Sequence, residues 1–330
     1  MYDNPSQGQP EPSGRGGDAA QGAQVQGQPQ QQAPKPQPKP QKPGPRISIP
    51  KNRRLLVIIG IMLVVFLVLV VALHFDTVIS VQNLTKYDNV IVPSSFLARL
   101  QIPDNISNAV GLGSQSNNLL PVSGTPMYNG TKPVIVYVGA EYCPYCAAER
   151  WAMLIALMRF GSFTGIRYMT STISDYSPST PTFTFYNSTY TSSYVVFDSV
   201  ETETNTGAPL QKLSELQNAT YSKYDLNNVN IPPSNRGGIP FIDFANKTMI
   251  YGSSYLPENL TDPGKSILYQ MNWSGIAGQL SNPSSRQSQA IIGTANLFTA
   301  QICMLTNNTP SGVCSQPYVA NIEKILGNGA

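Results

Sequence analysis

Two cysteines separated by two residues are the feature of this sequence best suited to chemistry. Cys143 and Cys146 flank a Pro-Tyr dipeptide in the stretch "AEYCPYCAAERW". A pair with this spacing can hold a metal, form a structural disulfide or exchange disulfides with another protein. A zinc site needs four ligands. The only other cysteines, Cys303 and Cys314, do not have the spacing of a second pair of zinc ligands. No metal is therefore expected.

A redox-active pair is favoured over a purely structural one. A disulfide between Cys143 and Cys146 would close a loop too small to restrict the unfolded chain much. An inactive pair stays open as the alternative.

The sequence around the pair predicts a turn between a strand and a helix. Residues 134–138 form a β-branched run typical of a buried strand, and Gly139 ends it. After Cys143, apolar residues recur at three- and four-residue spacing, which predicts a helix with Pro144 in its first turn. The helix N-terminus would lower the pKa of Cys143 and make it the nucleophile. Cys146 would then attack the mixed disulfide and release the substrate.

A second segment, "RGGIPFIDFANKTMIYG" (236–252), predicts a hairpin. Strands are expected at residues 241–244 and 249–251, with a turn at 245–247. Pro240 stands directly before the first strand.

The two segments together resemble the thioredoxin superfamily. "AEYC" with a Pro-containing C-x-x-C resembles the thioredoxin active-site entry, and "CPYC" is typical of glutaredoxins. "RGGIP" resembles the loop that holds the superfamily's cis-proline. The resemblance implies an α/β fold with a central mixed sheet flanked by helices, a cis Ile239–Pro240 bond facing the cysteines, and no cofactor. It also implies a substrate-binding surface formed by Tyr142, Pro144, Tyr145, Ile239 and Pro240.

The sequence departs from a minimal thioredoxin in the distance between its two segments. Cys143 and Pro240 are 97 residues apart, so an insertion is expected at about 165–235, between the active-site helix and the cis-proline loop. DsbA-like oxidoreductases carry an insertion at this place, although a helical one. "GIRYMTSTIS" (165–174) is expected to be the next core strand. Tyr137 stands where thioredoxin has a buried aspartate.

The thioredoxin-like domain is placed at 126–330, with a C-terminal helical extension at about 281–330.

An uncharged run of 19 apolar residues, 55–73, predicts a transmembrane helix. At 1.5 Å per residue it spans roughly 28 Å, close to the thickness of a bilayer core. Residues 1–50 are Gln-, Pro- and Gly-rich and are expected to be disordered. Lys51, Arg53 and Arg54 favour a cytoplasmic tail, a signal anchor at 51–75 and an extracytoplasmic C-terminal domain. Residues 76–125 are expected to cap that domain and to begin with a short strand at 77–81.

Nine Asn-x-Ser/Thr sequons follow the predicted anchor and fit a glycosylated outer face. They begin at Asn83, Asn105, Asn129, Asn187, Asn218, Asn246, Asn259, Asn272 and Asn307.

Cys303 and Cys314 are expected to form a structural disulfide, which agrees with an oxidising exterior.

Composition excludes several classes of protein. The only histidine, His74, lies at the edge of the apolar run, so the large domain cannot hold a Ser-His-Asp triad or a His-rich zinc site. The net charge of +3 comes from a basic tail: residues 1–54 carry eight Lys/Arg and three Asp/Glu. The charge therefore gives no reason to expect nucleic acid as a partner.

The sequence therefore predicts an extracytoplasmic thiol-disulfide oxidoreductase, anchored in the cell membrane by a single pass. Its partners would be the thiols and disulfides of exported proteins, and a membrane thiol oxidase would recharge it. The alternative is a cell-surface glycoprotein that uses an inactive thioredoxin-like scaffold for adhesion or assembly. The layout of tail, anchor and outer domain also resembles an uncharacterised family of archaeal membrane-anchored thioredoxin-like proteins.

Overall fold

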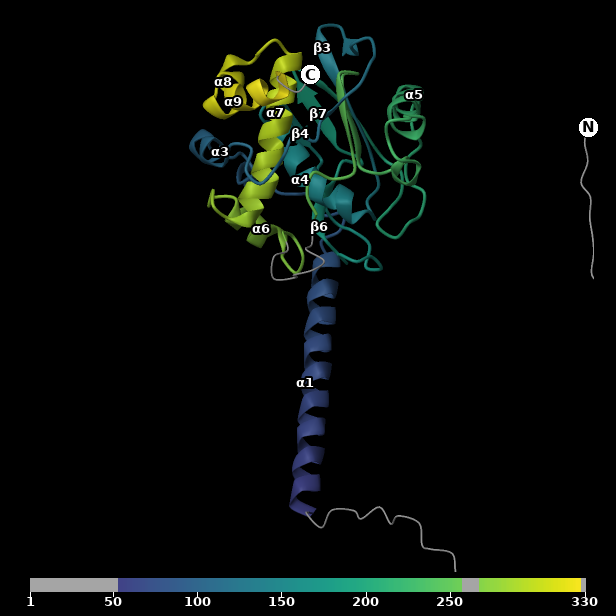
Figure 1. Cartoon of the computed structure of the whole chain (residues 1–330), viewed down its shortest axis with the longest axis vertical. Helices are drawn as coiled ribbons and strands as arrows, with labels where there is room; N and C mark the ends of the chain where they lie inside the picture. The colour runs from purple at the N-terminus through teal and green to yellow at the C-terminus, as the bar shows by residue number, and fades with distance from the viewer. Residues whose placement is uncertain (1–52, 257–266, 328–330) are drawn as a thin grey trace, which may run out of the picture. The chain divides into compact units, whose positions relative to one another are not determined.

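The computed structural model describes residues 53–256 and 267–327, without the side chains of residues 53–54 and 72–83 (Figure 1). The predicted tail, Asn259 and the side chain of Asn83 lie outside the described residues. The chain divides into two units, residues 1–59 and 60–330. Apart from the first residues of helix α1, the architecture below is that of the second unit.

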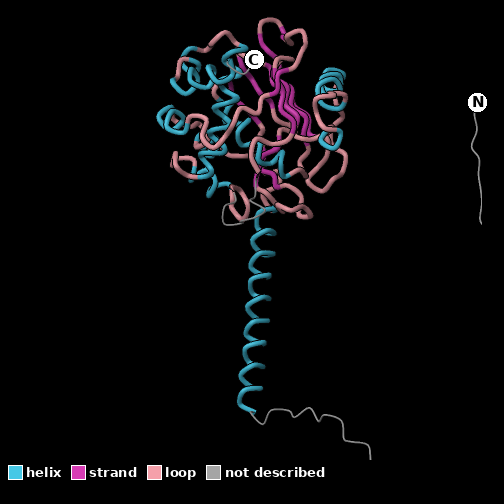
Figure 2. The backbone as a smooth tube through the Cα atoms, in the orientation of Figure 1, coloured by secondary structure: helices cyan, strands magenta, loops and turns pink. Residues whose placement is uncertain are grey.

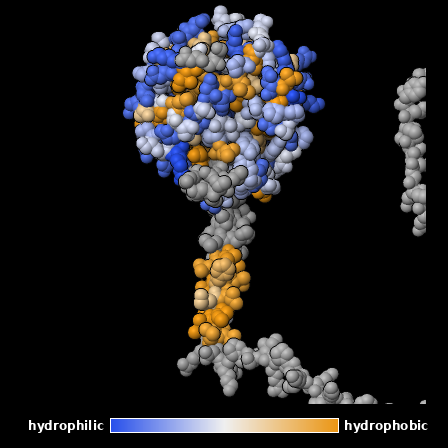
Figure 3. All heavy atoms as spheres, viewed as in Figure 1, coloured by the Kyte–Doolittle hydropathy of each residue, from blue (hydrophilic) through white to orange (hydrophobic). Residues whose placement is uncertain are grey.

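Helix α1 (Arg53–Thr85) contains the apolar run. The side chains of residues 55–71 are exposed and apolar, as the orange spheres in Figure 3 show. In the part of the chain whose side chains the structure describes, no helix is both long and apolar enough to cross a membrane. The strand expected at 77–81 is wrong, because α1 continues through it. Extending an existing helix is easier than starting a new element.

A mixed sheet of six strands forms the centre of the fold, and β3 (Lys132–Gly139) is its middle strand. On one side β3 pairs in parallel with β8 (Val196–Glu201), and on the other it pairs antiparallel with β9 (Phe241–Phe244). The sheet continues through β10 (Thr248–Tyr251) to β1 (Leu120–Pro121), while β2 (Tyr128–Asn129) pairs with the start of β3. The predicted mixed sheet and its 241–251 hairpin are confirmed.

The two faces of β3 contribute to two separate cores. Ile135 and Tyr137 belong to the larger core, whereas Val134, Val136 and Val138 belong to the smaller one. This alternation is the period of two that a strand imposes. It explains why the sequence run is apolar throughout, since both faces are covered.

Helices cover both faces of the sheet, and Figure 2 shows the magenta strands between them. Helix α4 (Pro144–Met158) follows β3 and packs on the larger core, and α7 (Gly293–Leu305) packs on α4. Helix α5 (Glu215–Tyr221) and the π-helix η1 (Ser222–Leu226) lie on the smaller core.

The region between α4 and the cis-proline loop differs from the expectation in one respect. Strand β5 (Arg167–Thr170) does not join the central sheet, because it pairs with β6 (Pro181–Thr184) in a two-stranded sheet. The parallel core strand is β8, which comes later and is only half-buried over most of its length. Its sequence "VFDSVE" alternates poorly and gives little strand signal, whereas β5 has a more typical pattern.

The remaining elements pack around these layers. The segment before the sheet supplies Phe96, Leu100 and Val110 to the larger core, as expected of a cap. The C-terminal region is helical as far as it is described. The other elements are α2 (Ser94–Ala98), α3 (Asp104–Val110), β4 (Gly161–Thr164), β7 (Thr189–Ser192), η2 (Pro233–Asn235), α6 (Trp273–Gln279), η4 (Ser288–Ile292), α8 (Ser311–Cys314) and α9 (Pro317–Gly327).

Candidate active site

The two central cysteines lie at the turn between β3 and α4, where the sequence places them. Cys143 is the N-cap of α4 and Pro144 is the first residue of the helix. The Cys143 sulfur accepts a hydrogen bond from the backbone N–H of Cys146 at 3.2 Å. Both thiols are free, and Cys143 is 4% exposed while Cys146 is completely buried.

The surroundings of the two thiols shift their pKa values in opposite directions. Hydrogen bonds from the Cys146 thiol and N–H lower the pKa of Cys143, and the charge of Arg150 adds to this effect. Burial raises the pKa of Cys146 well above its ordinary value, as does its hydrogen bond to Cys143. Cys143 is therefore the thiol that ionises more readily, as the sequence predicts.

The cis-proline loop faces the cysteine pair. The Ile239–Pro240 peptide bond is cis, as predicted. The Cys143 thiol donates to the carbonyl oxygen of Ile239, with 3.6 Å between sulfur and oxygen. The two segments are therefore in contact, although 97 residues separate Cys143 from Pro240 along the chain.

Asp225 in η1 holds the start of this loop. Its Oδ1 accepts a hydrogen bond from the N–H of Gly237 at 3.0 Å. Gly237 has a φ of +77°, a conformation that favours glycine. Burial raises the pKa of Asp225 to about 6, so this contact involves a carboxyl group that titrates near neutrality.

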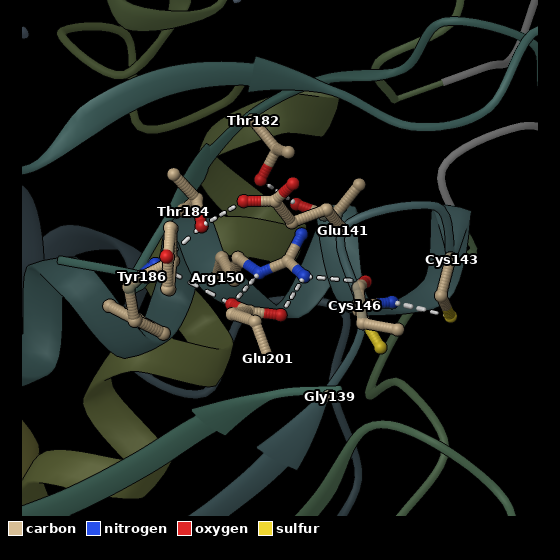
Figure 4. A network of polar contacts seen from close by, with 12 residues as sticks. Gly139, Glu141, Cys143, Cys146, Arg150, Thr182, Thr184, Tyr186 and Glu201 are labelled. Atoms are coloured by element: carbon tan, nitrogen blue, oxygen red, sulfur yellow. Dashed lines mark hydrogen bonds and ion pairs between the residues drawn. The ribbon is translucent and has the colours of Figure 1, made fainter. Parts of the chain in front are cut away.

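A buried ion pair lies directly behind the cysteines (Figure 4). The Arg150 guanidinium donates to both carboxylate oxygens of Glu201, with N–O distances of 2.9 and 2.6 Å. Its Nη2 also donates to the carbonyl of Ala140 at 2.6 Å. Both side chains are completely buried. Arg150 follows Cys146 by one helical turn, so the helix places the positive charge on the side of the thiols.

The polar network continues from the ion pair into the region of the predicted insertion. Glu141 is buried, and its carboxylate accepts a hydrogen bond from Thr184 at 2.6 Å (Figure 4). The hydroxyl of Thr182 donates to the carbonyl of Ala147 in α4 at 2.8 Å. Strand β6 is thereby attached to α4.

Of the predicted substrate-binding residues, those beside the cysteines differ in exposure. Tyr145 is exposed, Tyr142 is half-buried and Pro144 is buried. The ring of Tyr145 lies 5.5 Å from that of Tyr176. A backbone contact joins the same two segments, because the N–H of Thr172 donates to the carbonyl of Tyr142 at 2.9 Å. The loop that carries Thr172 and Tyr176 therefore borders the candidate site.

The second pair of cysteines forms the predicted disulfide. Cys303 in α7 and Cys314 in α8 are bonded, with 5.5 Å between their Cα atoms. Among the side chains that the structure describes, no group of three or more His, Cys, Asp or Glu could hold a metal.

Most of the predicted glycosylation sites that the structure describes are exposed: Asn105, Asn129, Asn187, Asn218, Asn272 and Asn307. Asn246 differs, because it is half-buried and its Nδ2 donates to the carbonyl of Thr125 at 2.9 Å. Asn246 is thus the least accessible of the described sequons.

The sequence analysis did not identify three polar residues, two in the ion pair next to the thiols and one that holds the cis-proline loop. Arg150, Glu201 and Asp225 lie far from the cysteines in sequence or within an apolar helix, and none belongs to a recognisable motif. One signal was present: Glu149 and Arg150 interrupt an otherwise apolar helical segment, and charged side chains are rarely buried unless they have polar or charged partners.

The chain belongs to a family described as a domain of unknown function (DUF929), which matches residues 118–304. The match extends from just before β1 into α7 and so includes both central cysteines, the ion pair and Pro240. No curated protein and no solved structure matches the chain.

Proposed function

We propose that this chain is a thioredoxin-like thiol-disulfide oxidoreductase that acts on exported proteins. The observation that carries the proposal is the arrangement of Cys143. Its thiol lies at a helix N-terminus and against the carbonyl that precedes a cis-proline, while a second, more deeply buried thiol lies behind it. A nucleophile with a lowered pKa and a resolving thiol within reach are what disulfide exchange requires.

The reaction proceeds in two exchanges. The Cys143 thiolate attacks a substrate disulfide, forming a mixed disulfide and releasing the first substrate sulfur as a thiolate. The Cys146 thiol then loses its proton and attacks the Cys143 sulfur, which releases the second substrate sulfur. The substrate disulfide is reduced by two electrons and the Cys143–Cys146 pair is oxidised. The same steps in reverse introduce a disulfide into a substrate dithiol.

The outer location is part of the proposal and is supported by the sequence. The apolar run 55–73, the basic residues before it and the sequons after it favour a single-pass anchor with an extracytoplasmic domain. An anchored domain would stay close to a membrane thiol oxidase that recharges it.

A trapped mixed disulfide tests this function. In cells that express Cys146→Ala, substrates attacked by Cys143 should stay attached and migrate as reductant-sensitive adducts on a gel. Cys143→Ala and the double variant are the matched controls and should carry none. If Cys146→Ala carries no more adducts than these controls, the assignment of Cys143 as a nucleophile toward proteins fails.

A scaffold without redox activity is the second candidate, and the low exposure of Cys143 favours it. A thiol that is only 4% exposed is poorly accessible to a large substrate. The two candidates differ in whether the pair can be reduced and reoxidised while the protein stays folded.

A further inference from the structure

Cys143 is almost enclosed, although disulfide exchange must bring a sulfur of another molecule against it. The residue is 4% exposed. The carbonyl oxygen of Ile239 in the cis-proline loop lies 3.6 Å from its sulfur and covers part of it. A thiolate reacts only with disulfides that can reach it. Whatever else covers the sulfur therefore decides which substrates react.

A second loop, residues 171–180, contacts the chain just before and just after the nucleophile. The N–H of Thr172 donates to the carbonyl of Tyr142 at 2.9 Å. The ring of Tyr176 is tilted against the ring of Tyr145, with 5.5 Å between the ring centres. Aromatic rings at such distances attract each other. The two contacts together hold the loop against the turn that carries the cysteines.

The base of this loop is fixed by backbone hydrogen bonds. The N–H of Ser171 donates to the carbonyl of Thr180, and the N–H of Ser179 donates to the carbonyl of Thr172, both at 3.0 Å. Ser171, Ser179 and Thr180 are buried. These bonds continue the pairing of β5 with β6 beyond the ends of both strands, so the base belongs to a regular element.

The tip of the loop, residues 173–176, is held much less firmly. Among the described residues, no hydrogen bond joins the tip to another part of the chain, because the N–H groups of Ser174 and Tyr176 donate to side chains within the loop. Ile173 is 66% exposed, and a hollow of about 500 Å³ lies beside it, bordered also by Asp88. The tip therefore has room to move, and the ring of Tyr176 keeps it beside the thiol.

We propose that the ring of Tyr176 restricts Cys143 to sulfurs in unfolded or extended segments and excludes those of folded proteins. This inference rests on the proposed function and names its substrate class. An extended segment is narrow and can lie along the cysteine turn beside the tip. A folded surface is wide and meets the tip before its sulfur reaches Cys143. The exchange itself is unchanged: the Cys143 thiolate bonds to one substrate sulfur, and the other leaves as a thiolate.

Two carriers of the same leaving group measure this selectivity. A coloured aromatic thiol is attached as a mixed disulfide to the single cysteine of a short unstructured peptide and, separately, to a surface cysteine of a small folded protein. Attack by Cys143 of the reduced full-length chain releases the coloured thiol, and the carrier stays bound to Cys143 until Cys146 resolves it. Each rate is divided by the rate of free dithiothreitol with the same carrier, which corrects for the hindrance of the carrier itself.

Tyr176→Ala should remove the selectivity. In the parent, the normalised rate should be at least about tenfold higher with the peptide than with the folded protein, because access limits the exchange. In Tyr176→Ala the folded protein should react about as fast as the peptide. The rate with the peptide should change by less than about twofold, because the reactivity of the thiol itself is unaltered.

Tyr176→Phe is the matched control. It keeps the ring and its contact with Tyr145, so it should show the selectivity of the parent. Tyr176 lies at the weakly held tip of the loop, and both variants should therefore keep a melting temperature close to that of the parent.

The outcomes separate this inference from the function beneath it. If the parent releases no coloured thiol from the peptide, the proposed function fails. If the parent reacts equally fast with both carriers, the function stands and the selectivity is overturned, without any variant. Selectivity that survives in Tyr176→Ala, equal acceleration with both carriers, or loss of selectivity in Tyr176→Phe would each overturn the role of the ring.

Discussion

Cys143 and Cys146 belong to one turn of the chain but differ in what surrounds them. The first accepts hydrogen bonds that stabilise its thiolate, whereas the second donates them and is completely buried. The difference comes from their positions, because Cys143 is the N-cap of α4 whereas Cys146 is its third residue and is completely buried. The N-terminus of a helix favours an anion, and this effect falls off within the first turn.

The reduced protein should therefore react with an alkylating reagent at one cysteine first. At mildly acidic pH, iodoacetamide should modify Cys143 well before Cys146, as followed by mass spectrometry of the peptides. Fully unfolded protein is the control and should show similar rates at both positions. Faster modification of Cys146 in the folded chain would reverse the assignment of the nucleophile.

Glu149 is a second residue whose burial has a measurable consequence. It is completely buried in α4, and its carboxylate accepts hydrogen bonds from the N–H and hydroxyl of Ser254 at 2.8 and 2.7 Å. Burial raises its pKa to about 7 from 4.5, so the folded state binds the proton more tightly than the unfolded state. Its contribution to stability is complete below about pH 4.5 and is lost as pH rises through about 7.

Glu149→Gln should therefore flatten the dependence of melting temperature on pH between 5 and 8. The expected loss in the parent over this range is at most about 3 kcal/mol from this group. Asp243 is also buried, with a pKa raised to about 7, so some slope should remain. The exposed Glu215→Gln is the control and should keep the slope of the parent. An unchanged slope in Glu149→Gln would show that the buried carboxyl is not protonated near neutrality.

At the scale of elements, local sequence patterns predicted the segments that carry the cysteines and Pro240, but they did not predict every strand of the central sheet. The strand–turn–helix around Cys143 and the 241–251 hairpin were predictable because each has strong apolar periodicity within a short stretch. Strand β8 was not, because it is held in the sheet by pairing with β3, which no local pattern reports. Glu201 on that strand was missed for the same reason, and the ion pair with Arg150 depends on contacts between distant segments.

The disulfide between α7 and α8 should contribute stability without taking part in exchange. The two cysteines are 11 residues apart, so their link is expected to stabilise the fold by about 2–3 kcal/mol. Replacing both with Ser should lower the melting temperature and leave unchanged the rate at which the reduced central pair reacts with a small aromatic disulfide. Loss of that reaction in a variant that remains folded would instead make Cys303 and Cys314 part of the redox site.

At the scale of the whole molecule, the proposal depends on which side of a membrane the domain occupies. Protease added to intact cells should digest the chain beyond residue 76 and leave an N-terminal tag protected, because the basic residues flank the N-terminal side of the apolar run. Lysed cells are the control and should lose the tag as well. Digestion of the tag in intact cells would show the opposite orientation, and the domain would then not lie in an oxidising extracytoplasmic compartment.

The most direct test of the central claim is a redox titration of the folded full-length chain. The chain is equilibrated in glutathione buffers of graded potential, and the oxidised fraction of Cys143–Cys146 is measured by alkylation and peptide mass spectrometry. We expect one reversible curve, reached from both the reduced and the oxidised protein, while Cys303–Cys314 stays oxidised throughout. A central pair that keeps its state at every potential until denaturant is added would contradict the oxidoreductase and favour the inactive scaffold.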